Sequence, residues 1–420
     1  MTLRLYNTMT RRKDVFRTRE EGIVRMFTCG PSIYGRPHLG NYRTFAWEDV
    51  LERYLEHLGY EVQRHMNLTD VEDKAIAEAE KEGTSVESLT RRKEEQFHEE
   101  SRLLRIQLPT GLHRSSRSIR QAVKLIQRLM AKGLAYRHGK DVFYDPTKFE
   151  GFGRLFRLDM TRWPKERRRF RKDTYPGRRW NMGDFILWHG YRAGDAVYWE
   201  TEIGKGRPSW NIQDPAVITE HLGFSIDIAC GGIDNLYRHH DYNIAVVEGV
   251  SGVELAPFWI HGEHLLVNGK KMSKSLGNIT YPEDLRTLGY SGEHIRFYLI
   301  FGHHREKINL TDSDLAVKAK ELDRLRNLAE RLCCGPPGEG TGAPSEEAVM
   351  TTISDLVPHF EFHMNNDLDV RGAVQTLLED LEKLAPEKTG GRMTAKTCSA
   401  LQEELQRIDR VLQVLFPLQD

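Results

Sequence analysis

Cysteine is scarce in this sequence, and long apolar runs are missing from it. The chain has only five cysteines, which are odd in number and irregularly spaced: Cys29, Cys230, Cys333, Cys334 and Cys398. Such spacing does not suit a disulfide framework and is typical of a protein from a reducing compartment. No apolar stretch reaches the roughly 18 residues that a membrane span requires. The first residues also lack the apolar core of a secretory signal, so we expect a cytoplasmic protein with no membrane partner.

The composition is that of a folded protein with several domains. The chain has 420 residues, of which 39% are hydrophobic, 29% charged and 9% aromatic. Disordered chains contain fewer apolar and aromatic residues, so this composition excludes wholesale disorder. At roughly 100–200 residues per domain, the length predicts two to four domains.

The net charge is zero, but the two signs are unevenly distributed. Residues 311–420 contain 12 Lys and Arg against 20 Asp and Glu, which leaves 49 basic and 41 acidic residues before them. Nine of those basic residues lie between Arg162 and Arg179, interleaved with aromatic residues. A polyanion is therefore expected to meet the first part of the chain. Most Arg-rich loops are solvated surface, whereas the aromatic residues in this one favour a stacking platform for nucleic acid.

The first seventy residues predict a strand, a helix and a second strand. Residues 23–29 have the composition of a short strand, which the pair Gly30-Pro31 is expected to end. Apolar residues at helical spacing follow from Phe45 to Leu58, and a second strand is predicted over residues 61–67. A strand, helix and strand in this order favour a parallel α/β sheet with right-handed crossovers.

The rest of the chain divides into an insertion, a return to the sheet, and a helical end. Helices are predicted over residues 71–104 and 118–134, strands of the sheet over 226–229 and 258–261, and mostly helix from Leu315 onward. Segment 136–210 is rich in Gly, Arg and aromatic residues, so we interpret it as an insertion into the sheet domain. The predicted units are a sheet domain of residues 1–135 and 211–310, the insertion, and a helical bundle over 311–420.

A His-Leu-Gly-Asn motif lies where the first strand should meet its helix. A helix N-terminus at this place directs backbone N–H groups and the positive end of the helix dipole toward a phosphate. Gly40 lets a ligand approach the backbone, and His38 can donate to phosphate oxygens as charge develops in a transition state. On its own, such a turn is more often structural than functional.

A second motif, Lys-Met-Ser-Lys-Ser, covers residues 271–275. Lys271 and Lys274 are three residues apart on a segment containing Ser and Gly, an arrangement that can clamp a pyrophosphate leaving group. The alternative interpretation is a solvated basic loop.

Together the two motifs resemble the two signatures of class I aminoacyl-tRNA synthetases, in the correct order and with an insertion between them. Within that class, the sequence resembles the cysteinyl-tRNA synthetase family over nearly the whole chain. The other matching segments are residues 5–8, 29–31, 67–74, 184–188, 206–212, 239–240 and 296–309. The resemblance implies a Rossmann-like catalytic domain with a parallel sheet and an insertion, followed by an α-helical bundle.

The resemblance also implies a reaction. A carboxylate of the amino acid attacks the α-phosphate of ATP, bound with Mg²⁺, and the acyl group then passes from the adenylate to an acceptor, normally the 3′ end of tRNA. It implies that His38, Asn41, Lys271 and Lys274 are catalytic residues. It also implies an ATP site that comprises Gly40, Gly232, Asp234 and Lys274. The family normally has histidine at position 41, and the asparagine present here can still donate a hydrogen bond.

The metal site of the family is altered. The family selects cysteine with a zinc ion held by two Cys, one His and one Glu, a ligand set that favours sulfur over oxygen. The corresponding residues here are Cys29, Asp214, His239 and Asn243. The first three can still hold zinc as a mixed S/O/N set, whereas Asn243 is a poor ligand.

Other departures fall on the amino-acid pocket, which the resemblance assigns to Cys29, Thr69, Trp210, Asp214, Ala229 and His239. Ala229 stands where the family has a histidine that lines this pocket. Two hypotheses follow: a modified zinc site that still takes cysteine, or an enzyme that activates a different amino acid.

The end of the chain leaves the acceptor open. The family normally follows its bundle with an anticodon-recognising module, which we do not find before Asp420. The leading hypothesis is a monomeric cysteine–tRNA ligase that contacts tRNA through its 3′ end. One alternative is a ligase that joins the activated amino acid to a small-molecule amine without tRNA. Another is a non-catalytic paralogue, against which the intact Lys271 and Lys274 argue.

Overall fold

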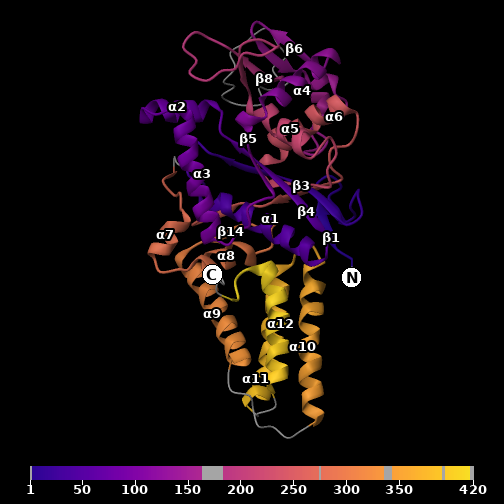
Figure 1. Cartoon of the computed structure of the whole chain (residues 1–420), viewed down its shortest axis with the longest axis vertical. Coiled ribbons are helices and arrows are strands. Elements are labelled where there is room, and N and C mark those ends of the chain that lie inside the picture. The colour runs from indigo at the N-terminus through magenta and orange to yellow at the C-terminus, as the bar shows by residue number, and fades with distance from the viewer. Residues whose placement is uncertain (1, 163–182, 274–275, 335–342, 390–392, 417–420) are drawn as a thin grey trace.

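The computed structural model of the protein describes residues 2–162, 183–273, 276–334, 343–389 and 393–416. The molecule is elongated, with a parallel sheet in its middle (Figure 1). A smaller sheet with helices α4, α5 and α6 lies at one end, and helices α9–α12 extend from the other (Figure 1). This confirms the α/β fold class with C-terminal helices that the sequence predicts.

The central sheet has five strands in the order β11–β10–β3–β4–β5, and all neighbours run parallel. The strands are β3 (Ile23–Ser32), β4 (Glu61–Thr69), β5 (Gly111–Arg114), β10 (Ile228–Gly232) and β11 (Phe258–Gly262). Helix α1 (Leu39–His57) makes the crossover from β3 to β4. The strand order reverses between β3 and β10, and ligands of open α/β sheets bind at the carboxyl ends of the strands beside such a switch point.

The prediction that Gly30-Pro31 ends the first strand is wrong. Strand β3 continues to Ser32, with a register shift against β4 between Cys29 and Ser32. Proline is tolerated where the ladder is irregular, because no N–H is needed there. Glycine is required at position 30, since a Cβ there would lie 2.1 Å from the carbonyl oxygen of Asn67.

The predicted long helix over residues 71–104 is two helices. Helix α2 (Asp73–Glu82) ends at Gly83, whose φ of 64° is left-handed, and α3 (Val86–Leu103) begins with Ser85 as its N-cap. Glycine adopts this conformation without strain and commonly ends helices. The short helix η1 (Ser115–Arg117) and α4 (Ile119–Ala131) follow.

The inserted segment forms an antiparallel sheet in the order β6–β7–β8–β9. Its strands are β6 (Ala135–His138), β7 (Asp141–Tyr144), β8 (Phe185–Gly190) and β9 (Gly206–Pro208), with short helices η2 (Pro146–Lys148) and η3 (Met160–Arg162) between them. Helices α5 (Trp210–His221) and α6 (Asp241–Ser251) pack against α4 beside this sheet. Apart from Arg162, the basic run that ends at Arg179 lies outside the described residues.

A small third sheet carries the second motif. Its strands lie in the order β13 (Lys270–Lys271), β12 (Leu265–Val267) and β14 (Ile308–Leu310). Asn268 and Gly269, both at positive φ (48° and 76°), form the two-residue turn from β12 to β13. Tight hairpins favour Asn-Gly for this reason. Helices α7 (Pro282–Thr287) and α8 (Gly292–Phe301) connect β13 to β14.

After residue 311, the described residues form the helices α9 (Asp312–Cys334), α10 (Ala343–Met364), α11 (Val370–Thr389) and α12 (Ala395–Leu412). Leucine and other apolar residues from these helices are continuous with the core around α1 and α8. The N-terminal hairpin of β1 (Arg4–Asn7) and β2 (Arg12–Val15) joins them, since the backbone N–H of Tyr6 donates to Asp367 Oδ1 over 2.7 Å.

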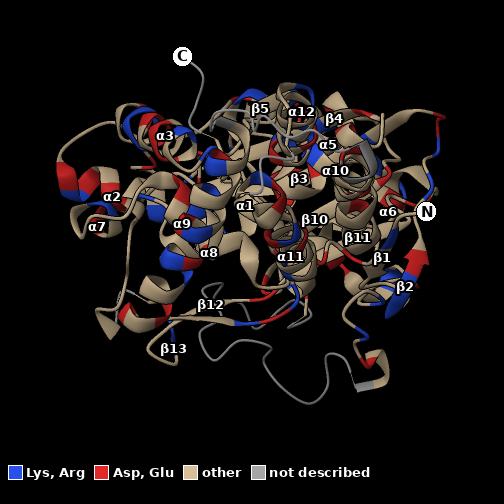
Figure 2. Cartoon of the chain, turned by 90° about the horizontal axis from the view of Figure 1, so that it is seen from below, with Lys and Arg blue, Asp and Glu red and all other residues tan. Residues whose placement is uncertain are grey.

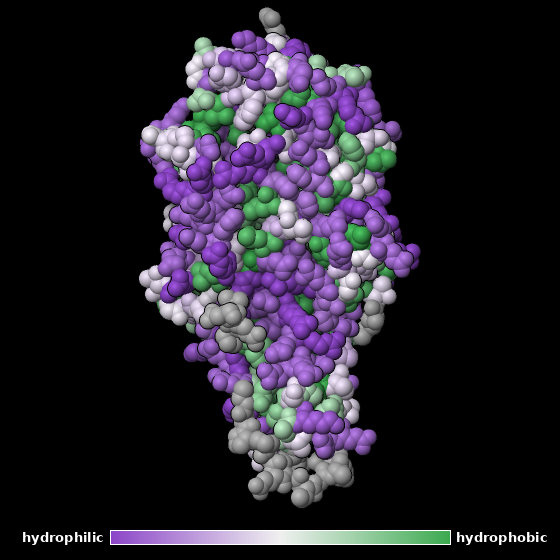
Figure 3. All heavy atoms as spheres, in the orientation of Figure 1, coloured by the Kyte–Doolittle hydropathy of each residue, from purple (hydrophilic) through white to green (hydrophobic). Residues whose placement is uncertain are grey.

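The charge at this end of the molecule differs from helix to helix. Viewed from the C-terminal helices, α9 carries both basic and acidic residues, whereas α10 has acidic residues and no Lys or Arg (Figure 2). The face shown in Figure 3 is mostly hydrophilic, with scattered apolar patches. Scattered apolar side chains are normal on a folded domain. In the described ranges, no helix combines the length and apolar character that crossing a membrane requires.

Candidate active site

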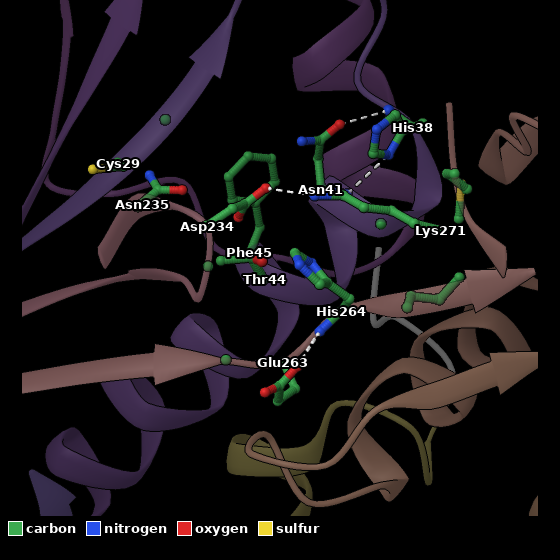
Figure 4. Close-up of a pocket in the computed structure, with 16 residues that line it drawn as sticks. Cys29, His38, Asn41, Thr44, Phe45, Asp234, Asn235, Glu263, His264 and Lys271 are labelled. Carbon is green, nitrogen blue, oxygen red and sulfur yellow. Dashed lines mark hydrogen bonds and ion pairs between the residues drawn. The ribbon is translucent and has the colours of Figure 1, made fainter. Parts of the chain in front are cut away.

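A pocket opens at the carboxyl ends of β3, β10 and β11, beside the point where the strand order reverses. The pocket is open to solvent, and its empty volume, counted with that open space, is about 740 Å³. Its lining includes Cys29, His38, Gly40, Asn41, Thr44, Phe45, Gly232, Asp234, Asn235, Gly262, Glu263, His264, Lys271 and Met272. Cys29 and Asn235 lie at one end of the pocket, and His38 and Lys271 lie at the other (Figure 4).

His38 caps the helix that points at the pocket. It is the N-cap of α1, and its Nδ1 accepts the backbone N–H of Asn41 over 3.3 Å. In return, Asn41 Oδ1 accepts the backbone N–H of His38 over 3.0 Å (Figure 4). Because Nδ1 is an acceptor, the proton of the neutral ring lies on Nε2. Burial lowers the pKa of His38, so the ring is neutral at pH 7 and offers Nε2–H as a donor.

Lys271 reaches the same pocket from the Asn-Gly hairpin. Its ammonium Nζ lies 3.3 Å from Asp234 Oδ2, and both side chains are more than half exposed. Burial opposes ionisation of Asp234, but the Lys271 ammonium, together with His264 and a backbone hydrogen bond, outweighs it and lowers the pKa of that carboxyl. An exposed pair of this kind is weak and exchanges readily for a stronger anion. Lys274 lies outside the described residues.

The two glycines predicted at the nucleotide site make room for these groups. A Cβ at Gly40 would lie 3.1 Å from the imidazole of His38. A Cβ at Gly232 would lie 2.8 Å from Oδ1 of Asp234. A larger residue at either position would displace the side chains that line the pocket.

Three of the four predicted metal-ligand positions meet at the Cys29 end. One ligand atom each of Cys29, Asp214 and His239 lies within 4.8 Å of the others. Cys29 Sγ is 3.5 Å from Asp214 Oδ2, and His239 Nδ1 is 3.9 Å from the same oxygen. The Cys29 and Asp214 side chains are buried, whereas that of His239 is 40% exposed. A thiol, a carboxylate and an imidazole at this spacing fit a zinc ion with a fourth position left open.

The protonation states of this cluster follow from its burial. Burial, reinforced by the Asp214 carboxylate, raises the pKa of the Cys29 thiol. Burial also opposes ionisation of Asp214, but His239 and the amide of Asn67 more than compensate and lower its pKa. Asn67 Nδ2 donates to Asp214 Oδ1 over 2.9 Å. Cys29 is therefore a thiol beside a carboxylate, and a metal ion would have to displace its proton.

The remaining predicted pocket residues have the following positions. Asn243 is buried in α6. Trp210 lies over His239, with ring centroids 4.7 Å apart. Ala229 is buried in an apolar cluster that also contains Cys29, and the Thr69 hydroxyl accepts from Asn67 Nδ2 over 3.3 Å.

Sequence reasoning missed two close neighbours of Cys29, namely His240 and Asn67. The Nε2 of buried His240 lies 3.2 Å from Cys29 Sγ, and its Nδ1 lies 2.8 Å from Nε2 of His261. Residues 236–240 form a π-helical turn, which brings both His239 and His240 to the cluster. The His-His pair was visible in the sequence, but no local pattern indicates that His240 contacts Cys29 as well. Asn67 was likewise visible only as part of a matching segment.

Comparison with known proteins finds relatives that match nearly the whole chain. Residues 15–320 match the family described as tRNA synthetases class I (C) catalytic domain. The cysteine–tRNA ligase of Chlamydia pneumoniae is 34% identical, in a match that covers 98% of this chain and 86% of that protein. The protein of the same name from Chlamydia felis is 36% identical over the same shares.

The chain belongs to the cysteinyl-tRNA synthetase family. Solved structures agree at the level of the fold. Methionyl-tRNA synthetase of Mycobacterium tuberculosis, bound by methionyl-adenylate, superposes with a TM-score of 0.68 at 15% identity, covering 93% of this chain and 92% of that one. A putative arginyl-tRNA synthetase from Campylobacter jejuni gives a TM-score of 0.62 at 10% identity, over 95% and 94%. The protein described here thus has the class I synthetase fold.

Proposed function

We propose that this protein activates cysteine with ATP and transfers it to tRNA. The observation that carries the proposal is the pocket, which has a neutral imidazole donor and a lysine ammonium at one end and Cys29 at the other. Cys29 in turn belongs to the group of possible metal ligands that includes Asp214 and His239. The first end suits a triphosphate and the second suits an amino-acid side chain. The similarity to cysteine–tRNA ligases supports the same assignment.

Activation would occur at the His38 end of the pocket. A carboxylate oxygen of cysteine attacks the α-phosphorus of ATP, the bond to the β-phosphate bridging oxygen breaks, and pyrophosphate leaves. His38 Nε2–H donates to a phosphate oxygen on which negative charge develops, which is worth most in the transition state. Asn41 holds the His38 backbone, and its amide nitrogen remains as a further donor. Mg²⁺ accompanies the nucleotide.

Lys271 would act on the leaving group. Its ammonium exchanges the Asp234 carboxylate for the more highly charged pyrophosphate, and Lys274 would add a second positive charge. Gly40, Gly232 and Asp234 would form the adenosine side of the site, where the glycines allow close approach of the nucleotide. The two ends of the pocket would thereby hold both substrates for in-line attack.

Cysteine would be selected at the other end. Cys29, Asp214 and His239 would hold a zinc ion, which when bound supplies a soft ligand site for the substrate sulfur and disfavours the hydroxyl of serine. Asn67 orients Asp214 through its hydrogen bond. Trp210, Ala229, Thr69 and Asn243 would shape the wall around the side chain. Asn243 would do so without ligating.

Transfer to tRNA would use the sheet domain rather than the C-terminal helices. We propose domains of 1–135 with 211–310, an insertion of 136–210 and a bundle of 311–420, in a monomeric cytoplasmic enzyme. The acceptor end of tRNA would approach the pocket from the side of the insertion, whose sequence carries the basic residues.

Exchange of labelled pyrophosphate into ATP tests activation before any acceptor is needed. Run with each of the twenty amino acids, it should give a signal with cysteine that exceeds all others. Absence of exchange with every amino acid would overturn the proposal. Exchange with another amino acid in place of cysteine would retain the activation chemistry and reject the substrate.

A further inference from the structure

Three histidines from three elements meet outside the candidate active site. They are His65 of β4, His113 of β5 and His221, the last residue of α5. Their nearest ring nitrogens all lie within 4.8 Å of one another, and His65 Nδ1 is 2.9 Å from His113 Nε2. The rings of His113 and His221 stack, with centroids 3.6 Å apart and planes 12° from parallel.

The sheet is built to let these rings meet. The register pairs His65 with Gly111 and Asn67 with His113, so His65 and His113 are diagonal neighbours on one face. A Cβ at Gly111 would lie 2.4 Å from Nε2 of His113 and 2.6 Å from Nδ1 of His65. The absence of a side chain at Gly111 therefore creates the space in which the two imidazoles converge.

Helix α5 adds the third ring. His221 follows Asp214 by seven residues, close to two helical turns, so both side chains lie on the same face of α5. Asp214 contacts Asn67 of β4, and His221 stacks over His113, which fixes this face against the sheet. The carboxylate of Glu220 adds negative charge nearby, with Oε2 3.9 Å from His221 Nε2.

Two of the three rings, His65 and His113, are weaker bases than a free imidazole. Burial, with the neighbouring His221 and His65, lowers the pKa of His113 to about 4. Burial and His221 also lower the pKa of His65. At neutral pH His65 and His113 are therefore uncharged, which is the form of imidazole that binds metal ions.

We propose that His65, His113 and His221 form a binding site for a divalent transition-metal ion, separate from the candidate active site. Imidazole nitrogens suit Zn²⁺, Ni²⁺ and Cu²⁺. Two ligands at about 2.0–2.1 Å from zinc are roughly 3.3–3.4 Å apart in a tetrahedral site. His65 Nδ1 and His113 Nε2 already lie 2.9 Å apart, whereas His221 must turn out of its stack with His113 to point a nitrogen at the ion. Glu220 or water completes the shell. The ion ties the end of α5 to β4 and β5, and α5 carries Trp210 and Asp214 at its beginning.

Titration of the full-length, tag-free, metal-free protein with Co²⁺ tests this site independently of the proposed function. Cobalt bound by imidazoles gives visible d–d absorption without the sulfur-to-metal charge-transfer band that a thiolate ligand produces. We expect the protein to bind one equivalent of Co²⁺ that shows d–d absorption without the sulfur-to-metal band. His221→Gln and His113→Gln should weaken it by at least on the order of 100-fold, since loss of an outer-shell partner alone costs 10–100-fold.

Two further variants keep the test interpretable. Gly111→Ala changes no ligand but fills the space between the rings, so it should weaken the same equivalent. His138→Gln, in the sheet of the insertion, should leave the titration unchanged. Identical titrations for the wild type, His221→Gln, His113→Gln and Gly111→Ala would overturn the proposal. The proposal would also be overturned if the cobalt ion that these variants fail to bind gives a sulfur-to-metal charge-transfer band in the wild type.

Discussion

His38 and Asn41 hold each other at the first turn of α1. The ring Nδ1 of His38 accepts from the Asn41 backbone, and the Asn41 side chain accepts from the His38 backbone. This reciprocal cap fixes the tautomer of His38, whose ring lines the pocket (Figure 4). The asparagine that departs from the family signature thus retains a defined structural role.

The first prediction concerns the pH dependence that His38 imposes. Because burial lowers its pKa below the ordinary value of about 6.5, His38 is neutral at pH 7 and gains a proton only on the acid side. Its protonation would break the Nδ1 acceptor contact, so kcat/KM for ATP in the exchange reaction should be flat from pH 7 to 8. The rate should fall only below about pH 6.5. A limb above pH 7 that disappears in His38→Asn would contradict this assignment.

The second prediction separates two adjacent lysines. Lys270 and Lys271 are both exposed in β13, but only Lys271 lines the described pocket. Lys271→Ala should reduce the pyrophosphate exchange rate by on the order of 100-fold, as removal of one transition-state donor typically does. Lys270→Ala is the matched control and should stay within about twofold, because an exposed charge outside the site contributes little. Equal losses in both variants would point to general electrostatic attraction of ATP.

The third prediction compares two buried thiols. Cys29 belongs to the ligand cluster, whereas Cys230 of β10 is buried in the core. The protein should bind a zinc equivalent that Cys29→Ala loses and Cys230→Ala retains, and cysteine-dependent exchange should fall with it. With Co²⁺ in place of zinc, this equivalent should show a charge-transfer band. Cysteine exchange that survives in metal-free protein would reject zinc as the selecting group.

A related variant restores the ligand of the family. Asp214→Cys exchanges a carboxylate for a soft thiolate and should tighten zinc binding by on the order of 10-fold. Competition with a chelator of known affinity measures this change. Unchanged or weaker binding would show that position 214 is not a ligand.

The fourth prediction concerns stability. Arg296 of α8 and Asp49 of α1 form a fully buried ion pair at 2.5 Å, and Arg296 also donates to the carbonyl of Leu412. Arg296→Met leaves the Asp49 charge undercompensated and should lower the free energy of urea unfolding by about 3–5 kcal/mol. Arg286→Met, which removes an exposed pair with Glu283, should cost about 0–1 kcal/mol.

The ionisation of Asp49 determines how the difference in unfolding free energy between wild type and Arg296→Met depends on pH. Burial opposes its ionisation, but Arg296 and other arginines lower its pKa. A carboxyl with a depressed pKa stabilises the fold above its unfolded value of about 3.9, and the contribution is lost as pH falls through the folded value. The gap between wild type and Arg296→Met should therefore be largest near pH 7 and shrink below about pH 4. A gap independent of pH would assign the loss to packing.

Local sequence predicted the elements that carry the site but not their ends. The strand before His38 and the helix after it were predicted, because breaker residues and apolar spacing are local signals. Continuation of β3 through Gly30 and Pro31 was not, since it depends on close approach to Asn67 of the neighbouring strand. The break at Gly83 was missed because glycine is also tolerated within helices.

The residues of the site likewise divide into those that the sequence identified and those that only the structure revealed. Cys29, Asp214 and His239 were named from the sequence and lie together in the structure, 185 residues separating the first two. That pairing came from resemblance to a family, because no local pattern links such distant positions. His240 and the cluster of His65, His113 and His221 were not found, since they depend on a π-helical turn and on strand register.

Charging of tRNA with labelled cysteine by the purified protein tests the central claim most directly. With ATP and total tRNA, we predict cysteine-dependent, base-labile label on tRNA, formed by the wild type and by Lys270→Ala and reduced in Lys271→Ala. An enzyme that exchanges pyrophosphate with cysteine yet leaves tRNA uncharged, while labelling a small amine, would contradict the account.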